Sequence, residues 1–224
     1  MTKIFIDPGH GGGDPGAVSK IKEADYTLPY ALELGRVLKS LGLQVGYTRT
    51  ADVFMSLSDR GARANQAAAD YFISIHFNAG GGIGVETYAL SAGGNAEKLA
   101  RAVQAPLVSY TGMANRGVKF ANFQVLRDTK MPAILIEGGF VDSADADKIK
   151  TEANKQNFVR GVSKGLCAFL GLPWSDPYAV PAETPKPADD PDVYLSVRVR
   201  TSKADAVVEQ IIKMGYACKR LDLA

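Results

Sequence analysis

The sequence predicts an α/β protein, in which a three-layer α/β/α domain with a mostly parallel six-stranded sheet is followed by a small βαβ-like unit. Short apolar runs alternate with segments of helical period from residue 1 to about residue 173. Several runs are continuously apolar, as expected for strands covered by helices on both faces. A proline-rich segment then separates this domain from the last residues.

The elements follow from local pattern. Strands are expected where short apolar or β-branched runs end in turn residues, at 2–7, 44–48, 71–76, 84–89, 123–126 and 132–137. Helices are expected where apolar residues recur every three or four positions or a capping residue precedes the run, at about 28–38, 56–69, 94–110 and 144–170. The alternation of the two favours parallel strands joined by helices.

Composition excludes some classes of partner. The 224 residues are 46% hydrophobic and 22% charged, which is enough to form a buried core. A net charge of +2 gives no indication of a nucleic-acid partner. No stretch approaches the roughly 20 apolar residues of a membrane-spanning helix, so we expect no membrane insertion.

The last part of the chain differs from the rest. Residues 174–192 combine five prolines with several acidic residues, which predicts an extended linker. Residues 193–224 then read as strand, helix and strand, a unit too short to be stable alone. We expect it to pack on the main domain, to have lost a partner half, or to pair with a second copy, which would give a homodimer.

Polar groups lie at the ends of three apolar runs. The chain has only two histidines, and His10 and His76 each follow such a run, while Glu137 follows the run 133–136. Ligands bind beyond the carboxyl ends of parallel strands in open α/β sheets. Two imidazoles with carboxylates at this edge suggest a catalytic metal, and zinc first.

Each of these residues also has a purely structural interpretation. His10 could lie by chance in the glycine-rich turn 7–13, and His76 could be a buried, hydrogen-bonded histidine. Glu137 could form a buried salt bridge. A carboxylate on a buried strand is nevertheless costly to desolvate without a partner, which makes Glu137 a good candidate for a general base.

Other polar residues are less informative. Glu23 precedes the first helix, and composition alone favours a solvated carboxylate stabilised by the helix dipole. Asn78 could orient a substrate amide or cap a turn. Arg60 and Arg63 share a helix face and are expected to be structural or surface charges.

Ten segments taken together resemble the zinc-dependent N-acetylmuramoyl-L-alanine amidases of the amidase type 3 family. The resemblance covers about residues 2–172, and each segment alone is weak, but the ordered set is specific. The segments are 6–12, 22–24, 48–49, 57–60, 64–65, 69–78, 84–86, 116–119, 123–127 and 132–140.

The resemblance implies a role for each candidate residue. His10, Glu23 and His76 would be the ligands of Zn²⁺, which replaces the solvated interpretation of Glu23, and Glu137 would be the catalytic carboxylate. The substrate would be bacterial peptidoglycan, cut at the amide between the lactyl group of N-acetylmuramic acid and L-alanine of the stem peptide. Asn78 remains a candidate for substrate binding.

The cellular role stays open between several alternatives. Met1 leads directly into the first expected strand, so we expect synthesis in the bacterial cytoplasm without a signal peptide and action on the wall after release, as in a phage endolysin. A bacterial autolysin, a zinc peptidase acting within the stem peptide and a wall-binding module without catalysis are the alternatives. Residues 193–224 loosely resemble half of a SPOR-type peptidoglycan-binding repeat.

Overall fold

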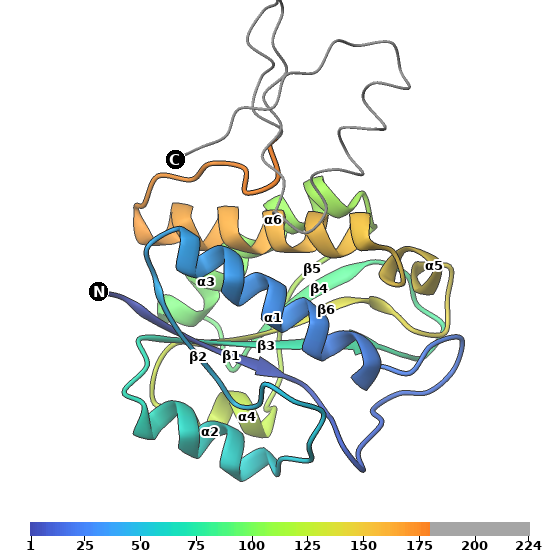
Figure 1. The fold of residues 1–224 in the computed structure, drawn as a ribbon, viewed down its shortest axis with the longest axis horizontal. Coiled ribbons are helices and arrows are strands. Elements are labelled where there is room, and N and C mark those ends of the chain that lie inside the picture. Colours follow the sequence, from blue (N-terminus) through green and yellow to red (C-terminus); the bar gives the residue numbers. More distant parts are fainter. Residues whose placement is uncertain (180–224) are drawn as a thin grey trace, which may run out of the picture. The chain divides into compact units, whose positions relative to one another are not determined.

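The computed structural model describes residues 1–179, which form one sheet with helices on both faces (Figure 1). The expected βαβ-like unit at 193–224 and most of the expected linker lie outside the described residues. In chain order the elements are β1 (Lys3–Pro8), α1 (Ala24–Ser40), β2 (Gln44–Tyr47), α2 (Leu57–Gln66), β3 (Tyr71–Asn78), β4 (Val85–Ala89), α3 (Gly94–Thr111), β5 (Asn115–Phe120), α4 (Gln124–Arg127), β6 (Ala133–Phe140), α5 (Asp145–Ile149) and α6 (Glu152–Leu170).

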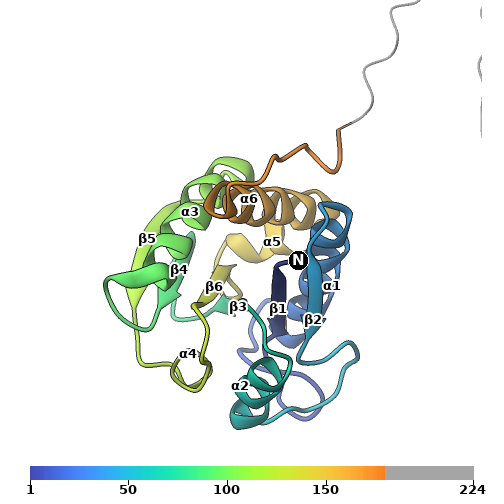
Figure 2. The ribbon, with the colours of Figure 1, turned by 90° about the vertical axis from the view of Figure 1, so that its left-hand side faces the viewer.

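The sheet is mixed but mostly parallel, which confirms the predicted fold class. Its six strands follow the order β2-β1-β3-β6-β4-β5. Only the β4–β6 pairing is antiparallel, and the other four pairings are parallel. Figure 2 shows the strands nearly end-on, with β5 and β2 at the two edges. The antiparallel pairing brings the beginning of β4 beside the carboxyl half of β6.

One predicted strand is wrong. Residues 123–126 were expected to be extended, but they form the start of the short helix α4, closed by the N–H of Arg127 donating to the carbonyl of Phe123. The adjacent residues Val125 and Leu126 are both buried, which a helical turn permits and a strand with one covered face does not. The sheet still has six strands, because residues 115–120 form β5, which the sequence pattern did not predict. β5 is a half-exposed edge strand without a continuous apolar run.

The two faces of the sheet carry different helices, as Figure 2 shows. Alternate strand residues such as Ile6, Ile75 and Ile136 pack in a large cluster with α1, α3 and α6. The residues between them, including Phe5, Phe72 and Leu135, pack in a smaller cluster with α2 and α4. The sheet is therefore the middle layer of the predicted three.

The smaller face is only partly covered. Helices α1, α3 and α6 have 17, 18 and 19 residues, whereas α2 has 10 and α4 has 4. At about 1.5 Å of rise per helical residue and 3.3 Å per strand residue, neither short helix spans the length of β3 or β6. The end of the sheet beyond them therefore remains accessible on this face.

The first residues of the expected linker pack on the domain. The indole N–H of Trp174 donates to Ser163 Oγ at 3.0 Å, and Tyr178 OH donates to Glu33 Oε1 at 2.6 Å. The guanidinium of Arg160 lies 4.7 Å from the centre of the Tyr178 ring. Helices α1 and α6 therefore bind residues 174–178, and a linker beginning further along the chain stays a prediction.

A buried carboxylate fixes the end of β1. Asp7 is fully buried, and its two oxygens accept hydrogen bonds from Thr48 Oγ1 at 2.6 Å and Ser74 Oγ at 2.7 Å. The guanidinium of Arg60, reaching from α2, lies 2.8 Å from Asp7 Oδ1 and is almost fully buried. The same guanidinium also donates to the carbonyls of Pro8 and His10.

A second buried arginine holds the other side of this loop. Arg49 donates through Nε to the carbonyl of Pro8 and through Nη2 to the carbonyl of Gly9 and to Thr27 Oγ1. Thr27 itself donates to the Gly9 carbonyl at 2.7 Å. Every carbonyl from Pro8 to His10 is thus held by a cation from another part of the chain.

We expect Arg60→Met to destabilise the metal-free protein by about 3–5 kcal/mol, because it leaves the buried Asp7 carboxylate without its cation. Urea unfolding in the presence of a chelator measures this. Arg101→Met is the matched control, since Arg101 is exposed and paired only with Glu97, and its loss should cost at most about 0.5 kcal/mol. Equal losses in the two variants would contradict a special role for the Asp7–Arg60 pair.

Candidate metal centre

Three predicted ligands meet at the carboxyl end of the sheet. His10 lies in the loop after β1, Glu23 directly precedes α1, and His76 lies in β3. One ligand atom of each residue lies within 4.8 Å of those of the other two. The sequence interpretation ended this strand at His76, whereas β3 continues to Asn78. Its place in the ladder fixes the backbone of His76.

Glu23 lies between the two histidines and is almost fully buried. Its Oε1 is 2.9 Å from His76 Nδ1, and its Oε2 is 3.1 Å from His10 Nε2. Backbone N–H groups of Phe77 and Ala17 donate to the same two oxygens. Burial opposes ionisation, but the hydrogen bonds to both histidines hold the pKa of Glu23 far below its usual range. Glu23 is therefore an anion at neutral pH.

His10 is held in an uncommon backbone conformation. Its φ of 57° lies in the left-handed region, which is unfavourable for a residue with a side chain. Its carbonyl accepts from Arg60, and its Nδ1 lies 2.9 Å from Asp14 Oδ2. Asp14 in turn accepts from the N–H of Gly16. These contacts orient the imidazole so that Nε2 faces Glu23.

Gly9 makes the close approach of the His76 ring to the loop after β1 possible. A Cβ at this position would lie 2.3 Å from the nearest atom of the His76 ring. The rings of His10 and His76 are perpendicular, with centres 4.9 Å apart. Any side chain at Gly9 would therefore displace His76 from the cluster.

Glu137 lies beside the cluster and has no hydrogen-bond partner for its Oε2 within residues 1–179. It pairs in register with His76 across β3 and β6, so both side chains point to the same face of the sheet. Glu137 Oε2 is also buried. Burial raises the pKa of Glu137 to about 7. The salt bridge considered from the sequence is therefore absent from residues 1–179.

The donor set fits a metal ion. Two imidazole nitrogens and an ionised carboxylate converge, and an unpartnered buried carboxylate oxygen lies next to them. Such an oxygen is costly to bury unless a cation or a proton donor occupies the adjacent space. His10, Glu23 and His76 could therefore hold a metal ion, with Glu137 beside it.

Asn78 lines a cavity next to the cluster, but its side-chain amide already makes hydrogen bonds within the protein. Its Nδ2 donates to Glu86 Oε1 at 2.8 Å, and its Oδ1 accepts from the N–H of Ala79. Substrate binding by Asn78 stays a prediction.

Asp14 and Glu86 are polar contacts that sequence reasoning missed. Their only signals are the position of Asp14 four residues after His10 and of Glu86 within a family-like segment.

A cavity of about 370 Å³ opens on the cluster from the partly covered face. Its wall combines the cluster and Glu137 with apolar residues from the start of α2 and from α4. The lining residues are His10, Ala17, Glu23, Leu57, His76, Phe77, Asn78, Ala79, Phe123, Gln124, Val125, Leu135 and Glu137.

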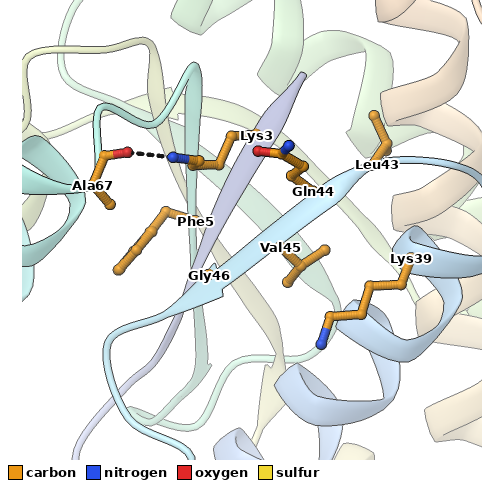
Figure 3. A pocket seen from close by; sticks show the side chains of 8 residues that line it. All are labelled: Lys3, Phe5, Lys39, Leu43, Gln44, Val45, Gly46 and Ala67. Carbon is orange, nitrogen blue, oxygen red and sulfur yellow. Dashed lines mark hydrogen bonds between the residues drawn. The ribbon is translucent and has the colours of Figure 1, made fainter. Parts of the chain in front are cut away.

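A larger cavity, about 450 Å³, lies by the edge strand β2 and has no such chemistry (Figure 3). It is lined by aliphatic and aromatic groups, Gln44 and two lysines, and it contains no carboxylate or imidazole. Lys3 there donates to the carbonyl of Ala67 at 2.6 Å. The smaller cavity is therefore the candidate site, because two imidazoles and two carboxylates converge in its wall.

Comparison with known proteins identifies the family over most of the described domain. Residues 4–168 match the family model described as N-acetylmuramoyl-L-alanine amidase. The chain belongs to this amidase family. It is 43% identical over 171 residues to the sporulation-specific N-acetylmuramoyl-L-alanine amidase of Bacillus subtilis (strain 168), covering 74% of this chain and 67% of that protein.

Two further relatives of this amidase are informative. The endolysin of Bacillus phage SPP1 is 35% identical over 218 residues, covering 88% of this chain and 80% of the endolysin. The crystal structure of the N-acetylmuramoyl-L-alanine amidase from Clostridium difficile 630 is 39% identical with a TM-score of 0.73, and the match covers 76% of this chain and 97% of that one. Within residues 1–179 of the amidase, no helix is long and apolar enough to span a membrane.

We expect Asp14→Ala to weaken the binding of a divalent metal ion by about 10- to 100-fold, because His10 loses the partner that orients its ring. Competition with a chromophoric chelator measures the affinity. Asp147→Ala, which removes an exposed carboxylate paired with Lys150, is the control and should leave the affinity unchanged. An unchanged affinity in Asp14→Ala would show that the backbone alone orients His10.

Proposed function

We propose that this amidase is a zinc-dependent peptidoglycan hydrolase that cleaves the amide between the lactyl group of N-acetylmuramic acid and L-alanine of the stem peptide. The observation that carries the proposal is the convergence of His10, Glu23 and His76 beside the unpartnered carboxylate of Glu137. Membership of the amidase family supports the bond that is cut. The donor set of two imidazoles and one carboxylate supports zinc.

Each residue has a separate task in this proposal. His10, Glu23 and His76 hold the metal, and Asp14 orients His10 through Nδ1. A bound zinc ion supplies Lewis-acid chemistry, polarising a carbonyl and lowering the pKa of water. Glu137 takes a proton from the attacking water and later gives it to the leaving amine of alanine. Glu137 lines the cavity, and its Oε2 has no hydrogen-bond partner among residues 1–179, which suits this proton transfer.

We expect Glu137→Gln to lower turnover by about 10²- to 10⁴-fold while metal content stays at the wild-type value, because only the proton acceptor is lost. Turbidity loss of purified cell walls and elemental analysis of the same sample measure the two properties. Near-normal lysis by this variant would exclude Glu137 as the general base.

We expect His76→Ala to lose both metal and activity, because it removes a ligand at the centre of the cluster. In the wild-type protein, a chelator should abolish lysis and added Zn²⁺ should restore it. Lysis that persists at full rate in protein shown by elemental analysis to be metal-free would contradict the metal-dependent mechanism.

Product analysis distinguishes the amidase from a zinc peptidase with the same ligands. Mass spectrometry of the released fragments should show intact stem peptides with a free alanine amine and glycan chains that keep the lactyl group. Fragments of the stem peptide would favour the peptidase instead. Wall binding without any release would favour a binding module that lacks catalysis.

The endolysin role is supported by the extent of one alignment. The match to the phage SPP1 endolysin covers 88% of this chain, a larger share than residues 1–179 represent, so it includes part of 180–224. The match to the sporulation amidase covers 74%. We therefore propose a phage endolysin acting on the wall after release, with a bacterial autolysin as the second candidate. Lysis genes beside the coding sequence would favour the phage role.

The domain arrangement after the catalytic domain also remains a proposal. In it, residues 193–224 form a SPOR-like wall-binding or oligomerisation unit after a proline-rich linker. If this unit pairs two chains, light scattering of the full chain will give the mass of a dimer. A monomer at micromolar concentration would leave wall binding as its proposed role, which a wall sedimentation assay measures.

A further inference from the structure

Charged side chains form a series that runs from the cluster of His10, Glu23 and His76 across the sheet to its edge. His76 in β3 pairs with Glu137 in β6, and Glu137 pairs with Glu86 in β4. Paired residues of neighbouring strands point to the same face, so these three side chains form a row. The last strand, β5, places Arg116 and Lys119 at the end of this row, where both contact Glu86.

Glu86 is the residue that the other polar side chains at the outer end of this row contact. Its side chain is 1% exposed, and it accepts hydrogen bonds from four donors. Asn78 and Tyr88 donate to Oε1, and Arg116 and Lys119 donate to Oε2. These ion pairs hold the pKa of Glu86 below its usual range despite the opposing effect of burial. One buried anion thus faces two cations, so the group has a net positive charge.

Two contacts orient the Arg116 side chain, and part of its guanidinium remains exposed. Its Nε donates to Glu86 Oε2 at 2.6 Å, and its guanidinium lies 4.8 Å from the centre of the Phe140 ring. The side chain is 34% exposed. Its Nη1 and Nη2 make no hydrogen bond with any of residues 1–179. These two groups form the planar fork that binds a carboxylate through two parallel hydrogen bonds.

We propose that Arg116, oriented by Glu86 and assisted by Lys119, binds a free carboxylate of the stem peptide beyond the scissile amide. The inference rests on the proposed function and names the part of the substrate that this edge recognises. Neighbouring strands lie about 4.8 Å apart, so β5 is roughly 10 Å from β6. An extended peptide covers about 3.3–3.6 Å per residue, so roughly three residues reach from the amide at Glu137 to Arg116.

This arrangement predicts a preference between wall chemistries. An amidated stem-peptide carboxylate is neutral and has an N–H donor in place of one oxygen, so it cannot accept the two parallel hydrogen bonds of the guanidinium fork. A charge-assisted pair of hydrogen bonds is then lost, and Arg116 and Lys119 receive no anionic group from the substrate. We expect walls with free carboxylates to be the better substrates.

Two soluble N-acetylmuramoyl peptides test the proposal, one with free side-chain and α-carboxylates and one with the same groups amidated. We expect the full-length wild-type enzyme loaded with Zn²⁺ to cleave the free form with a kcat/KM about 10- to 100-fold higher, mainly through KM. Arg116→Gln should reduce this ratio to near one, and Arg116→Lys should keep only part of it. Arg101→Gln, an exposed arginine on α3, should keep the full ratio.

The outcomes separate this inference from the proposed function. If neither peptide is cut at the lactyl-alanine amide, the proposed function fails. If both are cut equally by the wild type, or if Arg116→Gln keeps the preference, the carboxylate site is overturned while the amidase function stands. Should Arg116→Gln unfold, Lys119→Gln serves in its place and should lower the ratio less, and an unchanged ratio would count against the site. Peptides amidated at a single position then identify which carboxylate is bound.

Discussion

The catalytic end of this amidase depends on one buried carboxylate and the two buried arginines around it. Asp7 lies near the end of β1 in a fully buried position, and Arg60 neutralises it from α2. Arg60 and Arg49 then use their remaining N–H groups to hold the carbonyls of the following loop. The left-handed backbone of His10 is therefore supported by charged donors from two other segments. The stability of the loop and the proposed metal binding therefore depend on the same contacts.

Two buried carboxylates of the site differ because their surroundings differ. Glu23 receives backbone N–H groups and faces two histidines, so it is a stable anion suited to holding a cation. Glu137 has an oxygen without any partner among residues 1–179, so burial favours its protonated form. A group of the second kind can exchange a proton, whereas a group of the first kind cannot do so readily.

The unequal helix layers decide where a polymer can bind. Long helices cover one face of the sheet, and the short α2 and α4 leave the carboxyl end of the other face open. The row from His76 to Glu86 lies on that open face, and β5 adds cations at its end. The antiparallel insertion of β4 is what places Glu86 beside Glu137. The same sheet thus holds the proposed metal ligand His76, the proposed proton acceptor Glu137 and a cationic edge in one line.

The sequence by itself determined the fold class and the candidates His10, His76 and Glu137, because apolar periodicity marks strands and helices, and histidines and buried carboxylates are conspicuous at strand ends. Glu23 became a candidate only through the family resemblance. It misassigned 123–126, since a short buried helix and a short strand have similar composition, and it missed β5, whose half-exposed pattern carries no apolar run. Only the tertiary structure decided the contacts of Asp14, Glu86 and Arg116. Their partners lie on other strands and loops, and local sequence contains no information on which distant groups meet in space.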